Sequence, residues 1–229
     1  MSQQTKTTYA VDIVFCIDCT GSMQPYLESV KRSATEFHRL LEEKMAVKNK
    51  GIRQLRVRII AFRDIGEEGE ESIVATNFFS LPEEGTSFNT FVSKLTAGGG
   101  GDEPESALEA LALAIQSPWE RTMDKRRHIV VVCTDASAHP LGKFRLPARL
   151  SNLDLPSNMD DLNAMWGDEV DEGLMEFAAK RLLVFGPDKY PWSDLSELFE
   201  NCIWVKSEAG QGMTDADQDL VLDQIAGSV

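Results

Sequence analysis

Short apolar runs alternate along the chain with longer segments in which apolar residues recur every three or four positions. Residues 11–17 and 129–133 are the most apolar runs, and such runs are typical of central strands buried on both faces of a parallel sheet. Weaker patterns predict further strands at residues 56–62, 73–79, 181–185 and 202–205. The acidic turn before residue 73 is short, which predicts that this strand returns antiparallel to the one before it.

The segments with helical spacing predict the remaining elements. A long helix is expected over residues 25–45, and Pro104 marks the first turn of an apolar helix that extends to residue 115. Further helices are predicted at residues 88–95, 168–180, 191–199 and 215–226. Between them, residues 137–166 contain three prolines and show no regular period, which predicts a long irregular insertion.

Strands that alternate with helices predict an α/β fold of the Rossmann-like, doubly wound kind. We expect a mostly parallel central sheet with one antiparallel edge strand and helices on both faces, formed by a single domain over residues 1–229. In such sheets the functional crevice lies beyond the carboxyl ends of the strands. The insertion at 137–166 leaves from that edge, so we expect it to shape or cover a ligand surface.

Composition limits the classes of partner. The 229 residues carry a net charge of −14 with a sequence pI near 4.7, and this negative field disfavours nucleic acid as a partner. No apolar stretch approaches the length of a transmembrane helix, and the first residues lack the pattern of a signal peptide. We therefore expect a cytoplasmic protein.

Cysteine use fits that compartment. Cys16 and Cys19 form a C-x-x-C pair, which raises the question of zinc or redox chemistry. A zinc site needs a second pair of ligands at matching spacing, and the chain offers none. Cysteines in or beside predicted core strands are better explained as small buried hydrophobes.

The strongest chemical signal is the run DCTGSM that begins where the first strand ends. Asp18, Thr20 and Ser22 stand at alternate positions of one tight loop. Carboxylate and hydroxyl oxygens are hard ligands, which suit Mg²⁺, Mn²⁺ or Ca²⁺ rather than zinc. Asp135 follows another buried strand, so the fold should bring it to the same edge as Asp18.

A third segment completes the set. Four glycines, residues 98–101, precede the sequence DEPE at residues 102–105. Glycines allow a loop to approach a metal closely, and Glu105 would lie near the start of a helix, where a negative charge is favoured. Taken alone, Asp18, Thr20, Ser22 and Asp135 would each be better explained as ordinary helix caps or turn residues.

These three segments, in this order, resemble the von Willebrand factor A (vWA) domain family. That family carries a metal-ion-dependent adhesion site (MIDAS) written D-x-S/T-x-S, with an acid or threonine on a second loop and an aspartate on a third. The resemblance implies that a cation is held by Asp18, Thr20, Ser22, Glu105 and Asp135, some of them through water. Glu105 departs from the threonine common in the family, and Asp102 would act as an outer, supporting acid.

The resemblance implies a divalent-cation-dependent protein-binding module rather than an enzyme. Mg²⁺ is the expected metal, with Mn²⁺ or Ca²⁺ as alternatives, and an acidic residue of a protein partner would complete its shell. Similarity to stand-alone bacterial cytoplasmic vWA proteins suggests stress, signalling or defence complexes with a kinase, a phosphatase or an AAA-type ATPase. Two alternatives remain open: a magnesium-dependent phosphohydrolase that forms an aspartyl phosphate on Asp18, and a metal-free scaffold.

Overall fold

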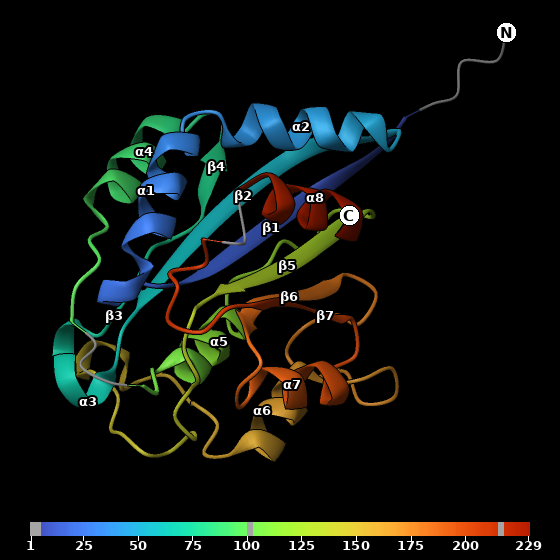
Figure 1. Ribbon diagram of the computed structural model, residues 1–229. Coiled ribbons are helices and arrows are strands. Elements are labelled where there is room, and N and C mark those ends of the chain that lie inside the picture. Colours follow the sequence, from blue (N-terminus) through green and yellow to red (C-terminus); the bar gives the residue numbers. More distant parts are fainter. Residues whose placement is uncertain (1–5, 100–102, 215–217) are drawn as a thin grey trace, which may run out of the picture.

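The computed structural model describes residues 6–99, 103–214 and 218–229 of the chain (Figure 1). Within these residues a single sheet has the strand order β3-β2-β1-β5-β6-β7, and β4 also pairs with β2. The strands are β1 (Thr7–Asp18), β2 (Lys50–Phe62), β3 (Ile73–Ala75), β4 (Phe79–Leu81), β5 (Arg126–Cys133), β6 (Lys180–Pro187) and β7 (Cys202–Ser207).

The sheet is mostly parallel, as the sequence predicts. Strands β2, β1, β5, β6 and β7 run parallel, whereas β3 and β4 both run antiparallel to β2. The predicted strand at 73–79 is therefore two short strands. Thr76 separates them because its side-chain oxygen accepts the backbone N–H of Ile59 at 3.0 Å, which replaces a regular backbone partner at that position.

Helices cover both faces of the sheet (Figure 1). They are α1 (Gln24–Ser33), α2 (Phe37–Val47), α3 (Ile65–Glu68), α4 (Gly85–Lys94), α5 (Ala107–Ile115), α6 (Met159–Trp166), α7 (Trp192–Leu198) and α8 (Gln218–Ser228), with 3₁₀ turns η1 (Gly21–Met23), η2 (Gly69–Glu71) and η3 (Ala148–Leu150). Helices α1, α2, α4 and α8 contribute to one apolar core, and α5, α6 and α7 to the other. No helix in these described ranges is both long and apolar enough to cross a bilayer.

Two helix predictions were wrong. The expected helix at 25–45 is interrupted between α1 and α2, where the Ser33 hydroxyl bonds the carbonyls of Ser29 and Val30 and competes with the backbone. The expected helix at 168–180 is absent. There the chain turns back against the end of α6, so that a Cβ on Gly173 would lie 2.3 Å from the carbonyl oxygen of Met165.

The segment at 137–166 is less irregular than its composition suggests. It contains η3 and ends in α6, whose start is capped by the Asn158 side chain, which accepts the N–H of Asp161 at 2.9 Å. The rest of the segment follows α3 and α5, with Phe144 packed against Gly66 and the Gln116 side chain bonded to the carbonyl of Asp154. The segment thus starts at the carboxyl edge of the sheet and then covers the α5 face.

Candidate metal centre

The register of the two central strands brings two site segments together. Ile17 of β1 lies beside Cys133 of β5, so the residues that follow them, Asp18 and Thr134, are neighbours at the sheet edge. The Thr134 hydroxyl donates to Asp18 Oδ2 at 2.7 Å. Parallel pairing therefore joins segments that are more than a hundred residues apart in sequence.

The loop after β1 folds back on its own first residue. Asp18 Oδ1 accepts the backbone N–H of Thr20 at 2.9 Å and its hydroxyl at 2.6 Å. The Thr20 and Ser22 hydroxyl oxygens lie 3.5 Å apart, and the Ser22 hydroxyl donates to Asp135 Oδ1 at 2.9 Å. Four of the five predicted ligands therefore form one continuous chain of oxygen contacts.

Glu105 lies beside this cluster through its backbone. It is buried, its N–H donates to the carbonyl of Ser137 at 2.9 Å, and its carbonyl accepts the N–H of His139 at 2.8 Å. These bonds hold Glu105 against the segment that follows Asp135. The predicted supporting acid, Asp102, is outside the described residues.

The glycine loop supports the first loop from the other side. The N–H of Gly98 donates to the carbonyl of Cys19 at 3.0 Å, and the N–H of Gly21 donates to the carbonyl of Gly99 at 3.2 Å. Arg63, at the end of β2, also donates to the Cys19 carbonyl at 2.9 Å. The backbone around the Asp18 loop is thus fixed by two neighbouring segments.

Sequence reasoning missed the contribution of the loop after β7. The N–H of Gly212 donates to Asp135 Oδ2 at 2.7 Å, and the N–H of Gly210 donates to the Asp135 carbonyl at 2.9 Å. Gly212 has φ +59°, and a Cβ there would lie 2.2 Å from the Ser22 carbonyl oxygen. The Gly-x-Gly spacing was the available signal, because close backbone contact and positive φ both require glycine.

His139, four residues after Asp135, also packs beside this site. It is buried, with Nε2 3.3 Å from Asp64 Oδ1 and Nδ1 2.9 Å from the Lys143 ammonium. Its backbone bond to Glu105 holds the start of the 137–166 segment against the residues that precede α5, and His139 is buried there.

Comparison with known proteins identifies the fold family. A family model described as the von Willebrand factor A domain matches residues 12–145, which is more than half of the chain and includes all five predicted ligands. The chain belongs to the von Willebrand factor A domain family. Domains of this family generally mediate protein interactions, so the chain carries a protein-interaction module.

Two larger proteins are similar to this vWA domain, one in sequence and one in structure. Alpha-protein kinase vwkA from Dictyostelium discoideum is 28% identical over 137 residues, which cover 58% of this chain and 20% of the kinase. Two crystal structures of the pilus adhesin SpaC from Lactobacillus rhamnosus GG, one in an open conformation, superpose with TM-scores of 0.53 and 0.52 at 11% and 12% identity. They cover 96% of this chain and 30% of the adhesin, and they show a shared fold.

Burial dominates the electrostatics of the vWA site. Asp18 is fully buried, and this burial raises the pKa of its carboxyl to about 6. Hydrogen bonds from Thr134 and Thr20 act in the opposite direction, and the negative charge of Asp135 raises the pKa further. A positive charge between the two carboxylates would relieve both the burial cost and their mutual repulsion.

The donor set fits a hard cation. Its atoms are carboxylate and hydroxyl oxygens, and the Ser22 residue is exposed while Asp18 and Asp135 are buried, so the cluster opens to solvent on one side. Across the described part of the chain, no three His, Cys, Asp or Glu side chains form a metal-binding group by themselves. A cation here would therefore depend on the Thr20 and Ser22 hydroxyls as well as the acids.

Proposed function

We propose that this vWA domain binds its protein partner through a divalent cation held at the Asp18 cluster. The observation that supports the proposal best is the connected set of oxygens from Asp18, Thr20, Ser22 and Asp135. Glu105, held beside Asp135 by its backbone, would add negative charge to the same site. Mg²⁺ is the proposed cation, with Mn²⁺ or Ca²⁺ as substitutes.

The cation would act as a Lewis acid that attracts an oxygen ligand from outside the domain. The partner group we propose is a carboxylate, because a hard cation prefers oxygen and gains from a negative charge. The net charge of this chain is −14, and the cluster itself contains Asp18 and Asp135. An acidic partner residue would be repelled by that charge in the absence of the cation, so binding should be strictly metal-dependent.

The first residues of the 137–166 segment contact Glu103 and Glu105, and these contacts support a role for the segment in shaping the partner-binding surface. Ser137 and His139 hold the Glu105 backbone, and Ser137 also donates to the Glu103 carboxylate at 3.2 Å. Lys189, near the end of β6, makes an ion pair with Glu103 at 2.6 Å. These contacts place a charged, partly exposed rim beside the proposed site.

The partner class we propose is a signalling or remodelling enzyme: a kinase, a phosphatase or an AAA-type ATPase. The relationship to a protein named as a kinase supports the first of these. Only a fifth of that relative matches this chain, so in that protein the matching part is joined to a much longer remainder. A bacterial cytoplasmic stress, signalling or defence complex is the setting that we propose for such an assembly.

We further propose that the domain is not itself an enzyme. A phosphohydrolase would use Asp18 as a nucleophile, and its carboxylate would have to reach the phosphorus atom of a substrate that enters from solvent. Asp18 is fully buried and both of its carboxylate oxygens accept hydrogen bonds. This environment suits a group that balances charge, and it argues against a group that attacks.

Calorimetric titration with Mg²⁺ and Mn²⁺ tests the proposal. The unaltered chain should bind one cation, and Asp18→Ala should weaken binding by at least about a hundredfold, because it removes a charged member of the cluster. Asp12→Asn is the matched control. Asp12 is a buried aspartate of the same strand, far from the cluster and paired with Arg56, so this variant should keep its metal affinity.

Circular dichroism would confirm that both variants fold before they are compared. Equal metal affinity in Asp18→Ala and the unaltered chain would overturn the proposed site. A folded chain that binds neither cation would favour the metal-free scaffold instead.

A further inference from the structure

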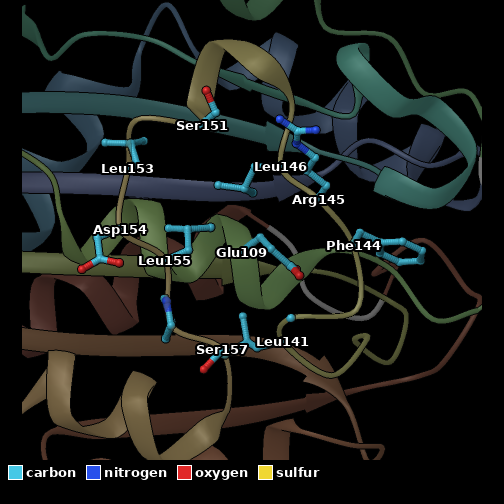
Figure 2. A pocket seen from close by; sticks show the side chains of 12 residues that line it. Glu109, Leu141, Phe144, Arg145, Leu146, Ser151, Leu153, Asp154, Leu155 and Ser157 are labelled. Atoms are coloured by element: carbon cyan, nitrogen blue, oxygen red, sulfur yellow. The ribbon is translucent and has the colours of Figure 1, made fainter.

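A hollow lies between α5 and the chain at residues 141–157, and none of its lining residues is a proposed metal ligand. Its volume is about 390 Å³, which is in the range of small-molecule sites (Figure 2). The floor includes Glu109 and Leu141, and the other lining residues come from the covering segment. Arg145, Leu146, Leu153, Asp154 and Leu155 are among them.

Glu109 is the feature that this hollow leaves unexplained. It lies on α5, where every residue is buried, and it is only 3% exposed. Neither carboxylate oxygen accepts a hydrogen bond from another residue of the described chain. Figure 2 shows the carboxylate among Leu141, Leu146 and Leu155, inside the ring of labelled side chains.

Such a carboxylate is costly to bury without a partner. Burial raises the pKa of Glu109 to about 7; a hydrogen bond from its own backbone acts in the opposite direction, and the nearby negative charge of Asp64 raises the pKa again. An apolar residue at this position would avoid that cost entirely. The geometry therefore suggests a group that is completed by a donor from outside the chain.

The surrounding charges indicate the sign of that donor. Arg145 lines the exposed rim, but no ion pair joins it to Glu109 in the described part of the molecule. A second hollow of about 720 Å³ shares the wall at residues 154–156 and carries the acids Asp154, Asp161 and Glu172. Acids thus outnumber bases across the two hollows, which favours a cation.

The walls indicate the rest of the ligand. Apolar side chains from Leu146, Leu153 and Leu155 line the space beside Glu109 (Figure 2). Hydrated metal ions prefer several oxygen ligands, whereas this floor provides one carboxylate in apolar surroundings. An ammonium group on an apolar body matches both the charge and the walls.

We propose that this hollow binds a small organic amine, whose ammonium group pairs with Glu109 while its apolar body packs against the leucines. The residues that line this hollow differ from the five proposed metal ligands. The hydrogens of an ammonium group would satisfy a carboxylate that accepts no hydrogen bond from any other residue the structure describes. The covering segment at 141–157 would then serve as the wall of a ligand site.

The test uses 4-phenylbutylamine as the probe and 4-phenylbutanol as its neutral counterpart. Binding of each is measured from the changes in backbone amide NMR shifts of the full chain. The amine should bind with a dissociation constant of about 1 mM or tighter and shift the amides of Gly142, Leu155 and Ser157. The alcohol should bind roughly tenfold or more weakly, because it cannot form the charged pair.

Two variants, one that removes a negative charge and one that removes a positive charge, test the ion pair further. Glu109→Gln keeps the shape of the side chain and should weaken amine binding about tenfold to a hundredfold. Arg145→Gln removes the rim cation and should strengthen amine binding by about twofold to fivefold. Thermal melts would show that both variants remain folded.

Several outcomes would overturn the proposal. Three results would show that no ion pair forms between the amine and Glu109. They are equal affinity for the amine and the alcohol, unchanged amine affinity in Glu109→Gln, and amide shifts that lie outside the hollow. Tighter binding of 4-phenylbutyrate would assign the hollow to an anion held by Arg145. Tighter binding of an end-capped Gly-Gly-Lys-Gly-Gly peptide than of the free amine would replace the small molecule by a protein partner.

Discussion

Asp18 and Glu109 are both buried carboxylates, but their surroundings differ. Asp18 accepts three hydrogen bonds, from the Thr20 backbone and from the hydroxyls of Thr20 and Thr134, and a second acid lies beside it. Glu109 lines a hollow together with several leucines and accepts no hydrogen bond from another described residue. Both pKa values are raised, to about 6 and about 7, and burial is the main cause in each case.

The difference shows how similar burial can serve different chemistry. Around Asp18 the protein has assembled hydroxyls and a second carboxylate at the end of parallel strands, which is an oxygen-rich arrangement suited to a hard cation. Around Glu109 it provides leucine walls and a rim that carries Arg145 and Asp154, without a cluster of oxygens, which suits an organic cation. The predictions below change one of the two environments at a time.

The largest expected effect is on stability, in Glu109→Gln. In the unfolded chain the pKa of Glu109 is near 4.5, and in the folded chain it is about 7, so the folded state holds the proton more tightly. The protonated carboxyl group is therefore tolerated best, below about pH 4.5. As the pH rises from there towards 7, the free energy of unfolding should fall by about 3 kcal/mol. Glu109→Gln should remove this loss.

Urea unfolding at about pH 5 and about pH 8 measures the effect. At the higher pH the variant should be more stable than the unaltered chain by up to about 3 kcal/mol, and the gap should narrow at the lower pH. A variant that is less stable at both pH values would mean that Glu109 has a partner within the protein.

Gly212→Ala tests the support that the last loop gives to the metal centre. The substitution forces a side chain into positive φ and against the Ser22 carbonyl, at a cost of about 2 kcal/mol. Because the Gly212 N–H also holds Asp135, Mn²⁺ affinity should fall by about tenfold. Thermal melts and calorimetry measure the two effects.

Gly210→Ala is the matched control for that variant. Gly210 has φ +66°, but a Cβ there meets nothing within 4 Å, so the substitution introduces backbone strain without a clash. It should cost about 1 kcal/mol of stability and leave metal affinity nearly unchanged. Equal loss of metal affinity in both variants would show that loop strain matters and the Gly212 contact does not.

A smaller effect is expected from Thr134→Val, which removes the hydroxyl that donates to Asp18 Oδ2 and keeps the shape of the side chain. The buried carboxylate would lose one of its donors and its fixed orientation, and metal affinity should fall by about threefold to tenfold. Thr134→Ser should restore it, because the hydroxyl returns. Unchanged affinity in the valine variant would show that Asp18 needs no orientation from β5.

Much of the fold could be predicted because apolar periodicity marks buried strands and helices directly. The strands at 11–17 and 129–133 were confirmed, and their parallel pairing placed Asp18 beside the segment that contains Asp135. The antiparallel return after residue 62 was also confirmed. Local periodicity was sufficient for these elements because burial on both faces leaves few alternatives.

The errors arose where tertiary contacts decide the local structure. The expected helix at 168–180 failed because Gly173 packs against the end of α6, and Lys180 donates to the carbonyls of Trp166 and Gly167. The roles of Gly212 and Glu109 were missed for the same reason. Gly212 becomes informative only when its loop meets Ser22, and Glu109 only when the 141–157 segment covers α5.

The most direct test of the central claim is a crystal structure of the chain grown with Mn²⁺, with an anomalous difference map calculated from diffraction data. The account predicts one strong peak within metal–oxygen distance of Asp18, Thr20, Ser22 or Asp135, and no such peak in crystals of Asp18→Ala. A peak at another site, or none at this cluster when Mn²⁺ is present in excess, would contradict the metal-dependent account.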